Sequence, residues 1–405
     1  METGGLIKKS KGKNSQKVVF QNRVKHIRGM AVKVSIQKKT FLFSFNARTS
    51  RGPMRERVSW FFKIWDELTP ELAGLGECGP LQGLSVELTP DFETVLESCV
   101  SKINESAIPI QQLQEGCESL TKLTALLSGI GLPVDLNMYS SIKFALETAF
   151  LDLYFGGKRM LFDNSFSMGQ PIPINGLIWM GGMDFMLQQV EIKIRDGFRC
   201  IKLKVGGLDF ERECDVLQYI RRKYFRDNIV VRLDANGALK PDEAMYKLKE
   251  LAKFGIHSIE QPLKKGSDRL AELCRESPIP VALDEELIGV IIREDKADLL
   301  DRIKPQFIIL KPALHGGLAG CEEWITVANE KNIGWWITSA LESNIGLNAI
   351  AQFTANYQVK TYQGLGTGSI YENNFSSPLK IDKENLVYGK GKWDLNDLGI
   401  FSEPD

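Results

Sequence analysis

The sequence predicts an α/β fold, a (β/α)7β barrel of the TIM type with a smaller α+β capping domain. From residue 174 onward, eight short β-branched segments alternate with helical stretches, which is typical of such barrels. The 405 residues exceed the length of one typical domain, so a second, smaller unit is expected. The hydrophobic (43%) and charged (25%) contents are those of a globular protein, which agrees with this expectation.

The predicted barrel strands end in polar residues. Their ranges are 174–180, 200–205, 229–234, 258–260, 281–284, 307–311, 334–338 and 361–365. Before them, residues 140–153 carry apolar side chains at helical spacing and predict a buried helix. Segments 31–45 and 58–64 alternate as strands do, on either side of a turn at 49–52. The glycine-rich stretch 72–79 then leads into helical sequence.

These segments suggest a division of the chain. The last residues, from Tyr371, leave no room for another barrel unit, so they are expected to return to the small domain. We therefore expect a capping domain at 30–135, completed by 370–405, and a barrel at 136–369. Residues 1–29 form a basic tail, either an arm for nucleic acid or membrane, or a solvated, disordered segment before a true start at Met30.

Charge and composition disfavour several classes of protein. Lys+Arg and Asp+Glu are both 51, which argues against a dedicated nucleic-acid binder. We find no run of 18 apolar residues and no signal-type segment, so we expect a cytoplasmic protein without a membrane partner. The seven cysteines form no CxxC pair and are expected to be free thiols. Neither a GxSxG motif nor a P-loop is present, and three scattered histidines do not form a metal site. The sequence leaves a homo-oligomer open.

Two lysines alternate with apolar residues in the second predicted barrel strand. Successive side chains of a strand point to opposite faces, so Lys202 and Lys204 share one face and Ile201, Leu203 and Val205 share the other. The apolar residues are expected to pack against the helices, which places both lysines inside the barrel. One interpretation is lysines that reach the rim. The other is a catalytic pair in which one ammonium lowers the pKa of its neighbour and frees an amine base.

Three successive predicted strands each end in an inward-facing carboxylate. They are Asp234, Glu260 and Asp284, 26 and then 24 residues apart. A single acid at such a position is usually a helix cap or a solvated loop residue. Three carboxylates at one end of a barrel, however, repel each other unless a cation lies between them. Oxygen ligands without cysteine or histidine favour Mg²⁺, with Mn²⁺ as an alternative.

The next predicted strand ends at Lys311, 27 residues after Asp284. Lys204 and Lys311 belong to the second and sixth of the eight strands, so they are expected to face each other across the barrel mouth with the carboxylates between them. This arrangement predicts that a lysine removes a proton α to a metal-bound carboxylate.

From about residue 31 onward, the sequence resembles the enolase superfamily, in the muconate-lactonizing-type subgroup with its Lys-x-Lys motif on the second strand. Within that subgroup it looks most like the o-succinylbenzoate synthase family. Besides the lysines and carboxylates, the resemblance rests on TSRG (49–52), GECG (76–79), INGLIWMG (174–181), RLDANGA (232–238), ITSALESN (337–344) and GLGTG (364–368).

This resemblance implies a magnesium-dependent syn dehydration of a small-molecule substrate, 2-succinyl-6-hydroxy-2,4-cyclohexadiene-1-carboxylate, to o-succinylbenzoate. That is a carbon–oxygen lyase reaction of bacterial menaquinone biosynthesis. Lys204 would remove the proton and return it to the departing hydroxyl, Lys311 would stabilise the anionic intermediate, and Lys202 would tune Lys204. The implied Mg²⁺ ligands are Asp234, Glu260 and Asp284.

The resemblance also implies that the capping domain closes over the barrel mouth through the turn at 49–52. Arg51 would meet an anionic substrate group or remain a solvated turn residue, and Arg232 would contact substrate or orient the carboxylates. Ser339, Gly364 and Gly366 would offer hydroxyl or backbone donors to the succinyl arm. His315 is interpreted as a structural loop residue. The full set of implied substrate-binding residues is Ser50, Arg51, Arg232, Asn236, Ser339, Gly364 and Gly366.

Two alternatives remain. An N-succinylamino-acid racemase, or a related epimerase or cycloisomerase, would use both lysines as opposed bases. Dipeptide epimerases usually carry an acidic DxD motif on the last barrel strand, and residues 364–368 contain no acid. The mandelate-racemase-type branch expects a His–Asp dyad where Lys311 stands. A non-catalytic barrel scaffold would be expected to have lost at least one of the two opposed lysines or the three carboxylates. All five are present: Lys204, Lys311, Asp234, Glu260 and Asp284.

Overall fold

The computed structural model describes residues 31–49 and 52–399. The basic tail expected at 1–29 and two predicted substrate-binding residues, Ser50 and Arg51, lie outside the described residues. No helix within the described ranges is both long enough and apolar enough to cross a bilayer.

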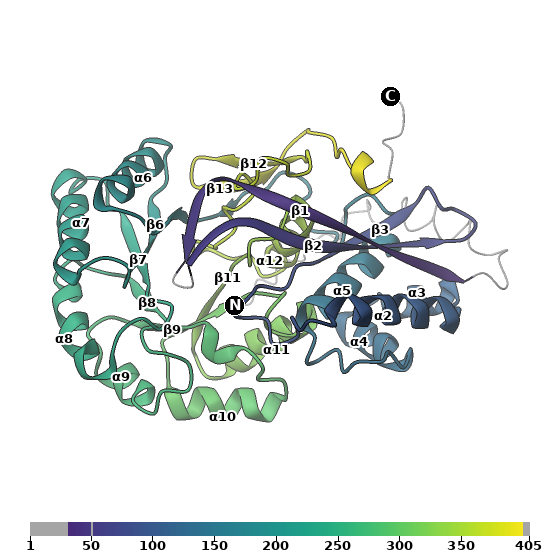
Figure 1. Ribbon diagram of the computed structural model, residues 1–405, viewed down its shortest axis with the longest axis horizontal. Helices are drawn as coiled ribbons and strands as arrows, with labels where there is room; N and C mark the ends of the chain where they lie inside the picture. Colours follow the sequence, from purple (N-terminus) through teal and green to yellow (C-terminus); the bar gives the residue numbers. More distant parts are fainter. Residues whose placement is uncertain (1–30, 50–51, 400–405) are drawn as a thin grey trace, which may run out of the picture.

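The N-terminal unit is a three-stranded antiparallel sheet flanked by helices (Figure 1). The long strands β1 (Val32–Thr49) and β2 (Gly52–Asp66) pair antiparallel as far as Thr49 with Gly52, which confirms the two predicted strands. The strands extend beyond the predicted bounds, and the register shifts once, between Leu42 and Ala47. The helices that follow the sheet are α2 (Phe92–Ser106), α3 (Ile110–Gly116) and α4 (Leu120–Gly129).

The glycine-rich stretch forms the third strand, β3 (Ala73–Cys78), which is buried along its whole length. Helix α5 (Ser140–Tyr154), the predicted buried helix, packs directly on β3. A methyl group on Gly74 would overlap the carbonyl oxygen of Ala149, and one on Gly76 would overlap that of Ala145. These two glycines therefore allow the backbones of helix and strand to touch.

Substitution of Gly76 by alanine is expected to destabilise the protein. The added methyl group meets the Ala145 carbonyl, which belongs to helix backbone and cannot rotate away, so the helix has to move. Such overpacking costs about 1–3 kcal/mol, and more where backbone shifts. Urea denaturation should show this loss in the free energy of unfolding. Gly129→Ala is the control, because a methyl group there meets no atom within 4 Å; equal losses in the two variants would contradict the packing argument.

The barrel sheet is parallel, in the sequential order β5-β6-β7-β8-β9-β10-β11. Its strands are β5 (Gly176–Ile178), β6 (Cys200–Lys204), β7 (Val230–Asp234), β8 (Ser258–Glu260), β9 (Val281–Leu283), β10 (Phe307–Leu310) and β11 (Gly334–Ile337). The helices that follow them are α6 (Met183–Arg195), α7 (Phe210–Lys223), α8 (Pro241–Ala252), α9 (Leu270–Glu276), α10 (Arg293–Ile303), α11 (Gly317–Glu330) and α12 (Asn344–Ala355). The predicted barrel-type α/β fold is confirmed.

Two predicted strands differ from the structure. The segment expected at 361–365 is reduced to isolated parallel bridges, Ile174 with Gln363 and Thr338 with Gly364. These bridges join the segment to both ends of the seven-stranded sheet, so it closes the barrel without being a regular strand. The segment expected at 174–180 is shortened to β5. Just before it, β4 (Ile172–Pro173) pairs in another sheet with β13 (Asn385–Tyr388), which in turn pairs with β12 (Leu379–Asp382).

The C-terminal segment also contacts the long hairpin. Tyr371 bridges to Phe43, and the backbone N–H of Ser44 donates to the carbonyl of Ile370. Aromatic rings of Phe41, Phe43, Tyr371 and Phe375 pack together there. These contacts join the segment around Tyr371 to the long hairpin, and the division into a capping domain and a barrel stays a prediction.

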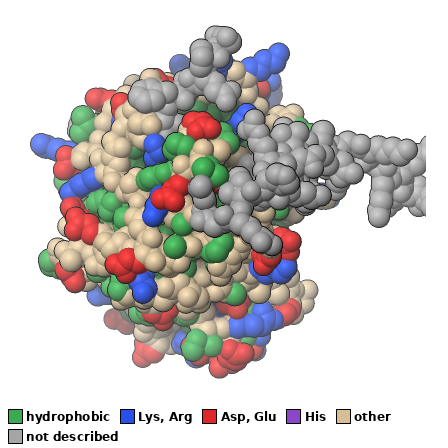
Figure 2. Space-filling view, turned by 90° about the vertical axis from the view of Figure 1, so that its right-hand side faces the viewer, with side chains coloured by type: hydrophobic (Ala, Val, Ile, Leu, Met, Phe, Trp, Pro, Cys, Tyr) green, Lys and Arg blue, Asp and Glu red, His purple; other side chains and the backbone are tan. Residues whose placement is uncertain are grey.

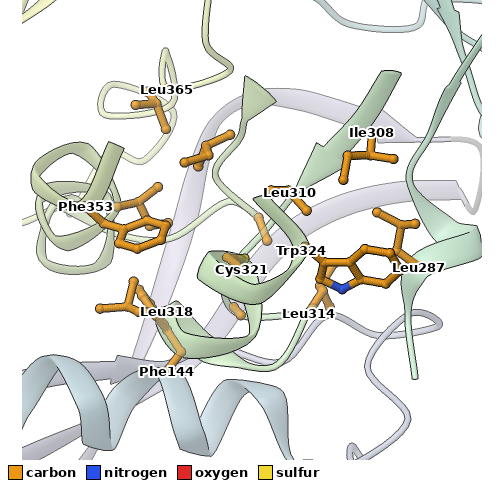
Figure 3. Packing of buried hydrophobic residues seen from close by; sticks show 14 of the residues in the cluster. Phe144, Leu287, Ile308, Leu310, Leu314, Leu318, Cys321, Trp324, Phe353 and Leu365 are labelled. Carbon is orange, nitrogen blue, oxygen red and sulfur yellow. The ribbon is translucent and has the colours of Figure 1, made fainter. Parts of the chain in front are cut away.

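Helix α11 lies between the two parts of the fold (Figure 3). Its Leu318, Cys321 and Trp324 are buried in the same apolar cluster as Leu310 of β10 and Phe144 of α5. All seven cysteines are free, as predicted. On the face shown in Figure 2, basic and acidic side chains are interspersed over the described surface.

Candidate active site

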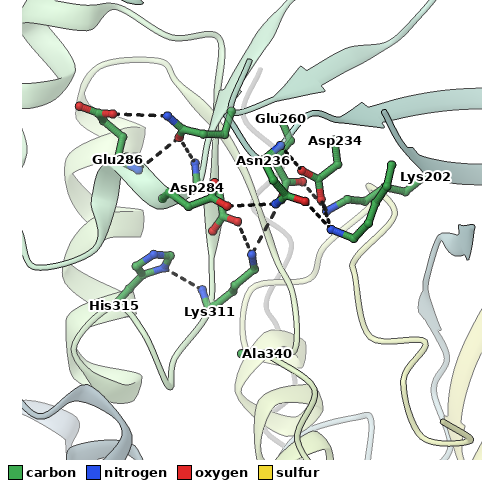
Figure 4. Close-up of polar contacts among 12 residues, drawn as sticks. Lys202, Asp234, Asn236, Glu260, Asp284, Glu286, Lys311, His315 and Ala340 are labelled. Carbon is green, nitrogen blue, oxygen red and sulfur yellow. Dashed lines mark hydrogen bonds and ion pairs between the residues drawn. The ribbon is translucent and has the colours of Figure 1, made fainter. Parts of the chain in front are cut away.

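The predicted lysines and carboxylates gather at the carboxyl ends of consecutive barrel strands (Figure 4). Lys204, Asp234 and Glu260 are register partners at the last positions of β6, β7 and β8. Asp284 and Lys311 directly follow β9 and β10. Parallel strands end at one face of a barrel, so consecutive strand ends bring these side chains together.

On one side, two ammonium groups share Asp234. Its Oδ2 lies 3.1 Å from Lys204 Nζ and 3.0 Å from Lys202 Nζ. Lys202 Nζ also donates to Glu260 Oε2 at 2.5 Å. Both lysines therefore point into the barrel, as the alternation of the strand predicts.

On the other side, Lys311 Nζ donates to Asp284 Oδ2 and lies 3.8 Å from Glu260 Oε1. The three carboxylates thus form a row with Lys204 at one end and Lys311 at the other. We call Lys202, Lys204, Asp234, Glu260, Asp284 and Lys311 the lysine–carboxylate row.

Burial and mutual charge shift the pKa values of the row. Burial alone would raise the pKa of Asp234, but Lys202, Lys204 and Lys311 hold it well below its usual range. The pKa of Glu260 is raised to about 8 by burial and by the neighbouring Asp234 charge. Burial opposes the charge on Lys202, yet Asp234 and Glu260 outweigh it and raise its pKa. Of the three carboxylates in the row, the central one, Glu260, therefore binds a proton most readily.

A fourth carboxylate, which the sequence analysis missed, adjoins the row. Glu285 is 9% exposed, and its Oε1 accepts a hydrogen bond from Asn236 Nδ2 at 3.0 Å. Asn236 Oδ1 in turn accepts from Lys204 Nζ at 2.6 Å, so Asn236 links Glu285 to Lys204. Alternation predicts that Glu285 points away from the row, but β9 ends at Leu283 and a 3-10 helix (Glu285–Leu287) begins. The sequence signal was the Asp-Glu pair at 284–285.

Two further residues hold the strand ends in place. Gln261 has a positive φ of 37°, and its Oε1 accepts from the backbone N–H of Asp284 and of Glu286 at 3.2 Å each. His315 Nδ1 accepts from the backbone N–H of Lys311 at 2.9 Å. Burial lowers the pKa of His315 to about 3, so its ring is neutral. Its contacts agree with the structural role expected for it, whereas Gln261 was missed.

The row offers oxygen atoms suited to a hard cation. Glu260 Oε1, Asp284 Oδ1 and Glu285 Oε2 are buried without a hydrogen-bond partner. Four carboxyl groups also face three lysines, so the carboxyl groups outnumber their lysine partners. Among the described residues, no three acidic, histidine or cysteine side chains surround a common point as metal ligands do, and ammonium groups bridge the carboxylates instead. The carboxylate oxygens are therefore of the kind that binds a divalent cation, but in this structure the side chains are arranged as an ion-pair network with the lysines.

The remaining predicted residues have other contacts. The Arg232 guanidinium lies 3.9 Å from the ring centre of Trp336 and donates to the carbonyl of Tyr362, inside the barrel. Its pKa is lowered by burial. Ser339 Oγ is paired with Thr367 Oγ1 at 2.7 Å. The Gly364 N–H donates to the Ile337 carbonyl, so it is not a free donor for a succinyl arm; the expectation fails there because the segment closes the barrel.

Gly364 and Gly366 differ in their surroundings. A methyl group on Gly364 would overlap the Thr338 side chain, so this glycine is required for the bridge to Thr338. At Gly366 the nearest atom to such a methyl group would be the Asn175 carbonyl oxygen, at 3.3 Å. The close approach to Thr338 therefore explains why residue 364 is a glycine. Gly366 stays a predicted substrate-contact residue.

Comparison with known proteins identifies the family. Residues 186–393 match the family of enolase C-terminal domain-like proteins. The chain is 40% identical over 363 residues to an o-succinylbenzoate synthase of Desulfotalea psychrophila, covering 87% of this chain and 97% of that one. It is 26% identical over 299 residues to an L-Ala-D/L-Glu epimerase of Bacillus subtilis, covering 70% and 74%.

A solved structure agrees with these matches. The crystal structure of MenC from Desulfotalea psychrophila superposes with a TM-score of 0.79 at 38% identity, over 88% of this chain and 99% of that one. The match spans both the N-terminal sheet and the barrel. The chain therefore belongs to the enolase superfamily.

Proposed function

We propose that the protein is an o-succinylbenzoate synthase, a carbon–oxygen lyase that dehydrates 2-succinyl-6-hydroxy-2,4-cyclohexadiene-1-carboxylate. The observation that carries this proposal is the row of three carboxylates with a lysine at each end, in a chain 40% identical to an o-succinylbenzoate synthase. A dehydration that aromatises a ring needs a base beside the acidic carbon and a proton for the departing hydroxyl.

Lys204 supplies both functions. Its neutral amine takes the proton from the ring carbon that bears the carboxylate, and the resulting ammonium gives that proton to the departing hydroxyl, so water leaves from the same face. The electrons of the C–H bond form the third ring double bond, and the hydroxyl leaves with the electrons of the C–O bond and takes up the proton as water, which completes the aromatic system. Asn236 Oδ1, at 2.6 Å, and Asp234 Oδ2, at 3.1 Å, orient Nζ for the two transfers.

Lys311 and Lys202 act through charge. Lys311, at the opposite end of the row, carries an ammonium that stabilises negative charge developing on the substrate. Burial opposes the ammonium form of Lys311, but Asp284 and Glu260 raise its pKa, so it remains charged. Lys202 lies between Asp234 and Glu260 and fixes both in place. It contacts the same Asp234 oxygen as Lys204, and through this shared carboxylate it is proposed to tune the base.

A magnesium ion would be held by Asp234, Glu260 and Asp284, with Mn²⁺ as a substitute. When bound, it binds the substrate carboxylate and makes the α-proton more acidic. The buried oxygens of Glu260 and Asp284 that have no partner support this assignment. Substrate contacts are proposed for Ser50, Arg51, Asn236, Ser339 and Gly366.

An N-succinylamino-acid racemase is the second candidate. The placement of Lys204 and Lys311 at opposite ends of the row favours it, because two opposed bases are what racemisation needs. The chain is also 26% identical to an epimerase.

A direct assay tests the proposal. The purified protein, mixed with the cyclohexadiene substrate and Mg²⁺, is expected to form o-succinylbenzoate, followed by ultraviolet absorbance, and EDTA is expected to stop the reaction. Folded protein that binds Mg²⁺ but does not turn over the substrate would refute the synthase. Exchange of the α-proton of N-succinylamino acids in D₂O would then favour the racemase.

A further inference from the structure

A pocket lies outside the lysine–carboxylate row and contains none of its residues. It has a volume of about 630 Å³ and is lined by residues of α4, the start of α5, the segment 289–296 and the segment 314–326. Helices α4 and α5 therefore form one wall, and α10 and α11 form the other. Its volume falls in the range of pockets that bind small molecules.

Two buried lysines line this pocket. Lys143 is 5% exposed and Lys296 is 2% exposed. Lys296 Nζ is paired with Glu323 at 2.6 Å. Lys143 Nζ, by contrast, donates a longer hydrogen bond to Asn137 Oδ1, at 3.3 Å, and its charge also acts on the buried Glu147 carboxylate. An ammonium has three N–H donors, and burying them without acceptors is costly, so Lys143 has donors left for a ligand.

Further donors face the same space. Helix α10 begins here and no side chain caps it at Ile292, so its first backbone N–H groups are open to an anion, while Glu294 and Asp295 carry negative charge in the same turn. His315 and Thr124 also line the pocket, and His315 Nε2 and Thr124 Oγ1 are buried without a hydrogen-bond partner. Because His315 Nδ1 accepts the Lys311 N–H, the neutral ring carries its proton on Nε2, which is thus a donor.

Acidic residues line the pocket too, but nearer to solvent. Glu294 and Glu322 are exposed, and Glu323 is neutralised by Lys296. Arg293, another lining residue, is paired with Glu330. The buried part of the lining therefore presents the Lys143 ammonium, which has donors to spare, and two polar atoms without hydrogen-bond partners, whereas Glu294 and Glu322 lie at the exposed edge.

We propose that this pocket binds a small molecule through a carboxylate or phosphate group, held by Lys143 Nζ and the N-terminus of α10. The pocket is separate from the lysine–carboxylate row. It borders the loop that carries Lys311, because the Gly316 N–H donates to Ser140 Oγ and both residues line it.

Isothermal titration calorimetry of the full chain, with inorganic phosphate and with succinate in separate titrations, tests the proposal. At least one anion is expected to bind saturably with 1:1 stoichiometry. Lys143→Gln should weaken binding about tenfold or more, since it removes a charge-assisted hydrogen bond. Lys122→Gln is the matched control: Lys122 lies on α4, but it is exposed and paired with Glu118, so its loss should change little.

A second variant guards against misfolding of Lys143→Gln. Thr124→Glu keeps Lys143 and adds a carboxylate to the pocket, so it should also weaken binding about tenfold through repulsion. Lys204→Ala should bind the anion as the unaltered protein does. Binding by phosphate alone indicates a phosphorylated ligand, and binding by succinate alone indicates a carboxylate. No saturable binding of either anion, or binding lost in Lys204→Ala but kept in Lys143→Gln, would overturn the proposal.

Discussion

Lys204→Ala is expected to lower kcat for the dehydration by about 10⁴-fold, the upper end of what a positioned base contributes. The side chain is the proposed carrier of the transferred proton, and Lys202, which also contacts Asp234, is held between two carboxylates. Lys204 is not one of the proposed metal ligands, so its loss should not weaken Mg²⁺ binding. Stopped-flow absorbance measures the first effect and calorimetric titration with Mg²⁺ the second.

Two variants separate chemistry from charge. Lys204→Arg keeps a positive charge beside Asp234 but cannot release a proton near neutral pH, so it should be as inactive as the alanine variant. Lys193→Ala, at a half-buried lysine of α6 that lies over Phe198, should keep full activity. If Lys204→Arg retained substantial turnover, Lys204 would act through its charge and the assignment of the base would be wrong.

The sequence predicted the barrel and the row for the same physical reason. Strand alternation fixes the face of each side chain, and parallel strands end at one face, so Lys204, Asp234 and Glu260 had to become neighbours. The same logic extended to Asp284 and Lys311, although each lies one residue beyond its strand. Regular geometry was therefore sufficient for these residues.

What the sequence did not predict depends on irregular backbone. Glu285 joins the row because a 3-10 helix interrupts the alternation, and Gln261 reaches Asp284 from a left-handed backbone position. Arg232 obeys alternation, but its depth in the barrel and its stacking on Trp336 are tertiary features. Residues 361–365 read as a strand because of their position in the repeat, yet only bridges form.

The lysines of the row compete with a metal ion for the same carboxylate oxygens. Lys202 and Lys311 each bridge two carboxylates, so a cation among the same oxygens has to draw them away from ammonium partners. Glu285 offers the cation a further oxygen, because its Oε2 is buried without a hydrogen-bond partner. Asn236 connects Glu285 to Lys204 by hydrogen bonds. A change in the charge of Glu285 should therefore alter the hydrogen bonding of Lys204, the proposed base.

Glu260→Gln is expected to weaken Mg²⁺ binding at least about tenfold to 100-fold. Loss of a group that only orients a metal ligand already has an effect of this size, and Glu260 is a proposed ligand itself. Glu260 is central in the row, and its Oε1 is buried without a hydrogen-bond partner. The amide keeps the size of the side chain and one oxygen for Lys202, so the fold should persist. Magnesium titration by calorimetry measures the effect, and activity should recover partly at high Mg²⁺.

Glu147→Gln is the control for loss of a buried carboxylate. Glu147 is fully buried in α5, and its oxygens accept from the backbone N–H groups of Leu318 and Ala319, away from the row. This variant loses stability, because an amide group then faces one of those donors, but its folded form should bind Mg²⁺ as before. An unchanged magnesium titration in Glu260→Gln, or an equal loss in both variants, would mean that Glu260 is not a ligand and that the cation is held elsewhere.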